Sequence, residues 1–227
     1  MSYMITQLLN EERVARVRSW LDSTDYWSDG INSMIENNPG DGEVYKANLE
    51  LDRGHEGHAQ PSQIIYRALD RSTDFYNLCL PVKTSNIIFS RTSEGGFYKP
   101  HFDDYKLGQY SNTVFLSDPS EYDGGELTLW LNGKEERFKL KPGMMITYTS
   151  GVSHQVEKVT RGTREVAVFW TESEIKDDRL RNIIGDLYRC HNLLGSVPVL
   201  DSVKETQNDP RFLLSQIIHN IRRYNQK

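Results

Sequence analysis

The sequence has few cysteines, no long apolar run and no excess of basic residues, and each absence excludes a class of protein. Its 227 residues include two cysteines, Cys79 and Cys190, which lie far apart and lack the spacing of a metal-binding pair. No segment approaches the roughly 18 consecutive apolar residues of a membrane-spanning helix. The first residues lack the basic and apolar regions of a signal peptide. We therefore expect a cytoplasmic protein without a membrane partner, whose two thiols are reduced, buried and structural.

The charge balance argues against nucleic acid as a partner. The chain has 27 lysines and arginines against 32 acidic residues, for a formal net charge of -5. Binding to a phosphate backbone requires a basic face, and the only dense basic spot, Arg222-Arg223, reads as the solvated end of a helix. The 37% hydrophobic content is enough for a sizeable core.

Three regions differ in their patterns, and we expect boundaries at 1–83, 84–172 and 173–227. The first is helical and loop-rich, with a helix after the capping residue Asn10 and a second helix from Pro61 towards Pro81. The last region shows two helical patterns, at 173–195 with Ser173 as a cap and at 209–225. These last helices could pack on the rest of the chain or pair between subunits, so a monomer and a homodimer are both compatible with them.

The middle region reads as β-structure. About eight short runs rich in β-branched and aromatic residues are separated by turn signals. The Asn132-Gly133 pair predicts a hairpin, and residues 141–143 and 160–163 predict further turns. Strands at this spacing, with helices only before and after, predict a mainly β fold with flanking helices: a double-stranded β-helix, or jelly-roll, barrel.

Three residues in this region have the chemistry of a metal site. His101 and Asp103 are two apart in FYKPHFDDY, so on an extended segment their side chains share a face. His154 follows 51 residues after Asp103. Two neutral imidazoles and one carboxylate form the facial triad of non-haem Fe(II) oxygenases, which leaves coordination positions open for O₂ and a co-substrate.

Arg164 is the fourth element of this pattern, ten residues after His154. We expect a hairpin through Arg161-Gly162 to bring Arg164 alongside the strand of His154. A buried arginine can grip the far carboxylate of a dicarboxylate such as 2-oxoglutarate through a bidentate pair.

Other interpretations of these residues remain open. Each of these four residues, taken alone, is more often an ordinary surface or strand residue. A zinc hydrolase could use the same two histidines and one carboxylate, although it has no use for Arg164. A non-catalytic metal-binding barrel is a further alternative, and the intact set of three ligands with Arg164 argues against it. The pair His55 and His58, three apart, reads as a solvated loop bordering the cleft, because no further ligand completes a zinc site.

Four segments of the sequence resemble the bacterial PKHD-type hydroxylases, which are prolyl-hydroxylase-type Fe(II)/2-oxoglutarate dioxygenases. These segments are HFD, FLSDPSEYDGGELTL, KPGMMITYTSGVSHQVEKVTRGTREVAVFW and DLYRCHNLL. The resemblance covers residues 84 to 195. It implies Fe(II), 2-oxoglutarate and O₂, with ascorbate as an accessory cofactor. It further implies hydroxylation of a C–H bond in a prolyl residue of a peptide or protein, with a free amino acid or small metabolite as the alternative substrate. The implied iron ligands are His101, Asp103 and His154, Arg164 is implied to bind 2-oxoglutarate, and the implied pocket residues are Tyr98, Leu127, Val156 and Trp170.

The sequence departs from the family pattern at several positions. Phe115 stands where animal prolyl hydroxylases have a tyrosine that helps to hold the far carboxylate, so Thr113 or Thr147 is expected to supply the hydroxyl. Arg91 is expected to border the co-substrate or the substrate, and Tyr105 to contact the substrate. We expect residues 28–60 and 92–110 to form the walls of an open peptide groove.

Overall fold

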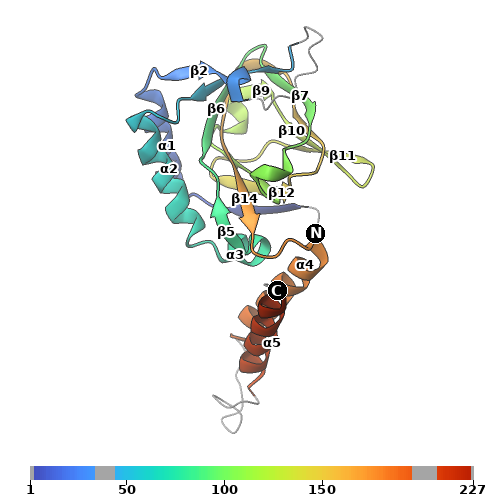
Figure 1. Ribbon diagram of the computed structural model, residues 1–227. Helices are drawn as coiled ribbons and strands as arrows, with labels where there is room; N and C mark the ends of the chain where they lie inside the picture. Colours follow the sequence, from blue (N-terminus) through green and yellow to red (C-terminus); the bar gives the residue numbers. More distant parts are fainter. Residues whose placement is uncertain (1–2, 34–43, 196–208, 226–227) are drawn as a thin grey trace. The chain divides into compact units, whose positions relative to one another are not determined.

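The computed structural model describes residues 3–33, 44–195 and 209–225, which form two compact units (Figure 1). The barrel unit contains the described residues up to Ser72 together with Lys83–Glu172. The helical unit contains Thr73–Val82 and the described residues from Ser173 onwards. Each of the helices in these ranges is too short or too polar to cross a lipid bilayer.

Two antiparallel sheets build the barrel unit. The larger one has nine strands, with the order β1-β12-β8-β14-β6-β4-β2 along its main path, and the smaller one has five, in the order β11-β10-β13-β7-β3. The strands of the larger sheet are β1 (Tyr3–Gln7), β2 (Trp27–Asp29), β4 (Leu49–Leu51), β5 (Pro81–Thr84), β6 (Ile88–Ser93), β8 (Tyr110–Phe115), β9 (Tyr122–Gly124), β12 (Met144–Thr149) and β14 (Val159–Ser173). Those of the smaller sheet are β3 (Lys46–Ala47), β7 (Phe97–His101), β10 (Leu127–Leu131), β11 (Lys134–Phe138) and β13 (His154–Val156).

The core of this unit lies between the two sheets. Alternate residues of each strand point inward, and the buried inward residues form one apolar cluster with contributions from both sheets. The larger sheet supplies Phe115, Ile146, Tyr148 and Val166, and the smaller sheet supplies Leu127, Leu129, Leu131 and Phe138. This packing of two antiparallel sheets confirms the predicted barrel.

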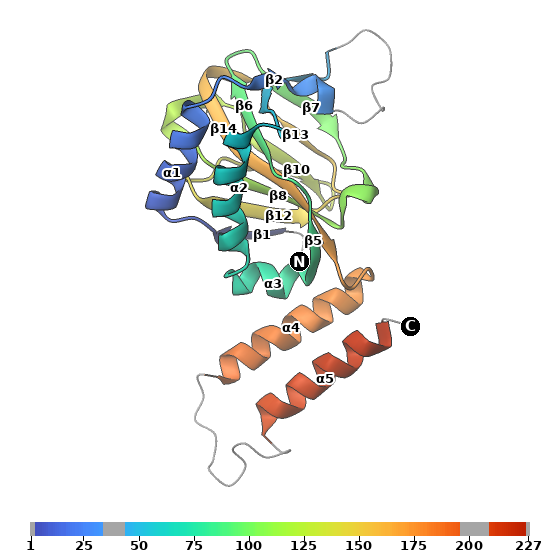
Figure 2. The same cartoon turned by 60° about the vertical axis from the view of Figure 1, so that its left-hand side comes forward.

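Helices α1 (Glu11–Asp22) and α2 (Glu56–Leu69) cover the outer face of the larger sheet, as both cartoon views show (Figures 1 and 2). Arg18 of α1 forms an ion pair of 3.3 Å with Glu165 of β14. The Nε2 atom of His58 lies 2.8 Å from the carbonyl oxygen of Ile87, beside β6. Three short 3₁₀ segments, η1 (Gly30–Ser33), η2 (Tyr105–Leu107) and η3 (Pro119–Glu121), connect the strands.

The helix boundaries confirm one N-terminal prediction and correct another. Asn10 caps α1 as expected, with its side chain accepting a hydrogen bond from Arg13 N at 3.0 Å. Helix α2, however, begins at Glu56 rather than Pro61, because the His55 side chain accepts from Gly57 N and starts the helix earlier. The pair His55 and His58 is therefore no solvated loop: one histidine is a cap and the other is buried against the sheet.

The helical unit consists of α3 (Thr73–Cys79), α4 (Asp178–Leu194) and α5 (Pro210–Asn225) around a small core of Leu80, Ile175, Ile184 and Ile218. Asp177, not Ser173, caps α4, since its Oδ1 accepts from Leu180 N at 2.7 Å. Cys79 is buried, as predicted, but Cys190 is exposed on α4, so the prediction of two buried thiols was half wrong.

Two glycines near predicted turns have different roles. Asn132 and Gly133 both have positive φ angles, 52° and 75°, and join β10 to β11 as the expected hairpin. The turn predicted at 160–163 is absent, because β14 runs unbroken from Val159 to Ser173. Gly162 has a φ of 73°, and a Cβ atom there would lie 2.1 Å from the carbonyl oxygen of Glu121. This glycine lets β14 pass close to η3 and β9, and it does not reverse the chain.

We expect Gly162→Ala to destabilise the barrel far more than Gly133→Ala. The second change adds only the cost of a left-handed residue, about 1–2 kcal/mol, because nothing lies within 4 Å of the new methyl group. Gly162→Ala meets the same cost and a backbone clash, so its free energy of unfolding should fall by more than about 2–3 kcal/mol. Urea denaturation measures both, with the open position Gly151→Ala as the control. Equal losses for Gly162→Ala and Gly133→Ala would contradict the close approach.

Candidate active site

Strand pairing places two histidines side by side at the cavity. His101 ends β7 and His154 begins β13, and the two residues are direct partners in the antiparallel pairing of these strands. Their ring centroids are 4.1 Å apart. The Nδ1 atom of His101 lies 2.8 Å from the Lys99 carbonyl oxygen, and that of His154 lies 2.9 Å from the Val152 carbonyl oxygen. Because a carbonyl can only accept, each Nδ1 donates, and each Nε2 is left with its lone pair for a ligand.

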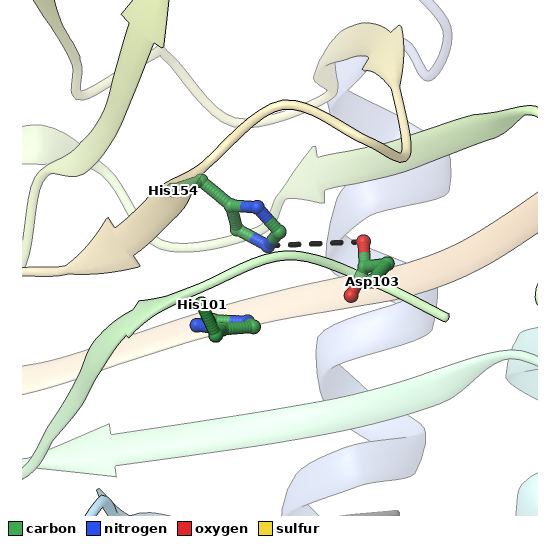
Figure 3. A group of neighbouring side chains, drawn as sticks. All are labelled: His101, Asp103 and His154. Atoms are coloured by element: carbon green, nitrogen blue, oxygen red, sulfur yellow. Dashed lines mark ion pairs between the residues drawn. The ribbon is translucent and has the colours of Figure 1, made fainter. Parts of the chain in front are cut away.

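Asp103 completes the group (Figure 3). Its backbone N–H donates to the Ser150 carbonyl at 3.1 Å, and the Ser111 hydroxyl donates to its Oδ2 atom. The same oxygen lies 3.7 Å from His154 Nε2. One potential ligand atom from each of His101, Asp103 and His154 lies within 4.8 Å of the other two. The structure thus brings the three predicted ligands together.

The protonation state of His101 suits metal binding. Burial, with a smaller contribution from the neighbouring His154, lowers the pKa of His101 to about 3. Its imidazole is therefore neutral at physiological pH, which is the form that binds a metal. Two imidazoles and one carboxylate fit Fe(II) and leave open positions on the metal.

Tyr98 packs directly on this group. Its ring stacks on His101 with a centroid distance of 3.5 Å and an interplanar angle of 18°. Burial, and then the carboxylate of Asp103, raise the pKa of Tyr98 to about 12, so its hydroxyl keeps its proton at neutral pH.

Arg164 reaches the cavity from the opposite sheet. It points inward from β14 with 2% of its surface exposed, and its guanidinium carbon lies 5.6 Å from the centroid of the Phe115 ring. Its Nε has no hydrogen-bond partner, and none of the carboxylates in the described part of the chain forms an ion pair with it. A buried cation with an unsatisfied N–H is costly, and an anion that enters the cavity would satisfy it. These residues therefore fit a dicarboxylate.

A cavity of about 330 Å³ connects these groups. Nine of the predicted residues line it: His101, Asp103, His154, Arg164, Tyr98, Thr113, Leu127, Val156 and Trp170. Parts of both predicted groove walls also line it, including Tyr45 and Phe102. The indole N–H of Trp170 is buried without a partner.

Other predicted residues lie elsewhere. Phe115 belongs to the inter-sheet core next to Arg164 and is not part of the cavity wall. Thr147 faces away from the cavity and donates to Asn112 Oδ1 at 2.8 Å, so of the two candidate hydroxyls only Thr113 lines the cavity. The backbone of Tyr105 begins η2, but its side chain lies outside the described part of the structure.

The structure places Arg91 outside the cavity, in contrast to the prediction. Its neighbours on β6, Ser90 and Thr92, line the cavity, so strand alternation turns Arg91 to the outer face. There its Nε lies 2.5 Å from Glu165 Oε1, and its guanidinium covers the ring of Trp27. The expectation that Arg91 borders the co-substrate or the substrate was wrong.

The hairpin that was predicted to position Arg164 beside His154 does not form. β13 pairs with β7 and β10 of the smaller sheet, whereas β14 pairs with β6 and β8 of the larger one. Arg164 therefore faces the histidines across the barrel interior and does not lie beside them in one sheet.

The sequence reasoning missed several residues of the cavity wall. Lys46 and Glu50 form a buried ion pair there. Tyr148 of β12 also lines the cavity, and the alternation of inward and outward side chains along this strand could have predicted its inward position. The segment YKANLEL, by contrast, carried no signal, because its two strands have only two and three residues and belong to different sheets.

The comparisons with known proteins agree with this geometry. The model of the 2OG-Fe(II) oxygenase superfamily matches residues 87–172. A PKHD-type hydroxylase of Gluconacetobacter diazotrophicus is 33% identical over 195 residues, which cover 82% of this chain and 84% of the relative. One from Cupriavidus metallidurans is 35% identical, covering 81% and 83%.

Solved structures share the fold at low identity. A prolyl hydroxylase from Trichoplax adhaerens, solved with a hypoxia inducible factor peptide fragment, superimposes with a TM-score of 0.58 at 15% identity, covering 79% of this chain and 86% of that one. A Pseudomonas putida prolyl-4-hydroxylase gives 0.52 at 18%, covering 76% and 92%.

The family supplies the activity that the pattern of histidines, carboxylate and buried arginine predicted. Its members depend on Fe(II) and 2-oxoglutarate, and the cavity offers a donor set and a buried cation that fit both. The chain is a dioxygenase of this kind and belongs to the PKHD-type hydroxylases of the 2OG-Fe(II) oxygenase superfamily.

Proposed function

We propose that the protein hydroxylates a prolyl residue of a peptide or protein, with Fe(II) on His101, Asp103 and His154 and 2-oxoglutarate on Arg164. The observation that carries the proposal is the arrangement of one cavity. It has three potential ligand atoms within 4.8 Å of one another and a buried arginine without a carboxylate partner on the opposite sheet. When bound, the iron and 2-oxoglutarate supply the oxidising chemistry that converts a C–H bond to C–OH with O₂, releasing succinate and CO₂.

The residues of the chain contribute position and charge. The two backbone carbonyls that accept from the Nδ1 atoms of His101 and His154 fix the orientation of both rings, and Ser111 fixes the carboxylate of Asp103. Arg164 gives the far carboxylate of the co-substrate a charge-assisted hydrogen-bond partner in a buried part of the cavity. Tyr98, Leu127, Val156, Thr113 and Trp170 would surround the co-substrate, with the indole N–H of Trp170 as a free donor.

The rim of the cavity supports a peptide substrate. Phe102, between the two predicted ligands His101 and Asp103, is 69% exposed and lines the cavity, as does the exposed Pro100. An exposed aromatic side chain at the mouth of a cavity offers apolar surface to a neutral ring such as that of proline. The peptide in the Trichoplax relative supports the same substrate class.

The proposed enzyme works in a reducing compartment. Both cysteines are free thiols, which supports a reducing, cytoplasmic location. We propose ascorbate as an accessory reductant. We further propose that the active form of the enzyme is a monomer or a homodimer.

His154→Ala should abolish the metal site. Anaerobic titration of the wild type with Fe(II) and 2-oxoglutarate should produce a weak visible charge-transfer band, which the variant should lack because one of three ligands is gone. Substrate-independent release of succinate should fall by more than about 100-fold. His219→Ala, an exposed histidine of α5, is the control and should keep both signals. A band retained in His154→Ala would remove this residue from the metal site.

Arg164→Met should weaken 2-oxoglutarate binding on the order of 100-fold, because the far carboxylate would lose its buried partner. The matched control is Arg161→Met, three residues earlier on the same strand, where an exposed arginine pairs with Asp123. Titration of 2-oxoglutarate into the Fe(II) protein measures both affinities. Similar values for wild type and Arg164→Met would place the co-substrate elsewhere.

Proline-containing peptides should stimulate succinate release and gain 16 Da, as expected for one added oxygen atom. The control is a peptide pool of the same sequences with alanine at each proline position, which should give neither signal. Mass spectrometry locates the hydroxyl group. Turnover with free amino acids and none with peptides would contradict the prolyl-peptide assignment and favour a small-molecule hydroxylase.

A further inference from the structure

A buried ion pair joins the two sheets next to the cavity. Lys46 lies on β3, at the edge of the smaller sheet, and Glu50 on β4 of the larger sheet. Lys46 Nζ lies 2.5 Å from Glu50 Oε1, and the two side chains are only 8% and 9% exposed. Ser33 bonds both partners: it accepts from Lys46 Nζ at 2.8 Å and donates to Glu50 Oε1 at 2.9 Å.

The same lysine contacts the aromatic ring that packs on the metal group. Lys46 and Tyr98 are direct partners in the pairing of β3 with β7, and Lys46 Nζ lies 5.0 Å from the centroid of the Tyr98 ring. Tyr98 in turn stacks on His101 at 3.5 Å. A continuous series of contacts therefore runs from Glu50 through Lys46 and Tyr98 to the imidazole of His101.

We propose that Lys46 and Glu50 are positioning residues, which hold the Tyr98 ring against His101 and so fix the direction of the histidine's Nε2 atom. This inference rests on the proposed metal site. Lys46 faces the ring of Tyr98 and Glu50 holds Lys46 in place, so we assign both residues an action through Tyr98. β3 is only two residues long and has little backbone pairing of its own. Together with the chain crossover at Asn48, the ion pair therefore ties this edge of the smaller sheet to the larger one.

The physical chemistry of buried charges favours a positioning role over one in stability. Removing two charges from water costs several kcal/mol, which their attraction roughly repays, so an apolar pair of equal volume stabilises a fold about as well. What an ion pair adds is direction, because Lys46 contacts Glu50, Ser33 and the ring of Tyr98 at the same time. Outer-shell contacts of this kind typically change metal affinity 10- to 100-fold.

The first test measures the affinity of the metal-free protein for Mn(II) by electron paramagnetic resonance, which separates free from bound ion without any turnover. We expect Lys46→Met to weaken Mn(II) binding about tenfold. Glu50→Gln, which keeps the shape of the side chain, should weaken it in the same direction. Lys46→Arg, which keeps the charge, should restore at least part of the affinity. Glu50→Gln also keeps the test open if Lys46→Met fails to fold.

Arg91→Met is a matched control on the other side of the larger sheet. Arg91 pairs with the buried Glu165 at 2.5 Å and covers the ring of Trp27 at 4.1 Å, so it repeats the combination of cation, buried glutamate and aromatic ring. It lies outside the cavity. We expect Arg91→Met to lower the free energy of unfolding while Mn(II) affinity stays within twofold of the wild type. Equal weakening in both variants would overturn the proposal and indicate general loosening of the barrel.

A double-mutant cycle tests the route through Tyr98. If Lys46 acts by holding this ring, Lys46→Met should add less than twofold to the loss of Mn(II) affinity already caused by Tyr98→Leu. Full additivity of the two losses, or a Lys46→Met protein that folds and binds Mn(II) within threefold of the wild type, would overturn the inference.

His154→Ala separates failure of this inference from failure of the proposed function. If the wild type binds Mn(II), His154→Ala does not, and Lys46→Met binds normally, the metal site stands and only the positioning role falls. If His154→Ala binds Mn(II) as the wild type does, the metal lies elsewhere and both proposals fail.

Discussion

The site depends on one backbone register, the pairing of His101 with His154 across β7 and β13. A slip of one residue would turn one of the two imidazoles to the other face of the sheet and break the group. The register is held on both sides, because Leu127 pairs with Val156 and Tyr98 also partners Val156 across a bulge. Both histidines then donate a hydrogen bond from Nδ1 to the carbonyl two residues earlier, so the strand backbone restrains each ring, and the stacked ring of Tyr98 adds a second restraint at His101.

The histidine ligands and the arginine that would bind the co-substrate come from different sheets, and this separation has an electrostatic reason. His101 and His154 lie on the smaller sheet, while Arg164, Val166, Val168 and Trp170 form the inward row of β14 in the larger one. A permanent cation beside the metal would repel it and compete for the carboxylate of Asp103. Placed across the cavity, Arg164 keeps its charge away from the metal and pairs with no carboxylate in the described chain. The carboxylates of the outer face, such as Glu165, already have partners in Arg91 and Arg18.

Sequence reasoning succeeded where local chemistry decides the structure and failed where register decides it. The His101–Asp103 pair and the Asn132-Gly133 hairpin are local signals, and the structure contains both as expected. Arg164 lines the same cavity as predicted, but it reaches the cavity from the other sheet and not through a hairpin. Whether Arg91 or its neighbours face the cavity depends on strand parity, which no single strand reveals. Gly162 looked like a turn residue because positive φ and close backbone approach both require glycine. His55 hid the true start of α2 because histidine is an uncommon cap.

The segment around Asn48 shows why the cavity wall was harder to predict than its ligands. The chain leaves the smaller sheet after Ala47 and joins the larger one at Leu49, so a single residue links the two sheets. Asn48 is held by Ser90 at 2.7 Å, and Gly30 packs so close that any Cβ there would collide with its side chain. Such a crossover has no periodicity, because its neighbours alternate within two different sheets. It nevertheless sets Lys46 and Glu50 opposite each other beside Tyr98, so this side of the cavity is shaped by a crossing of the chain rather than by a motif.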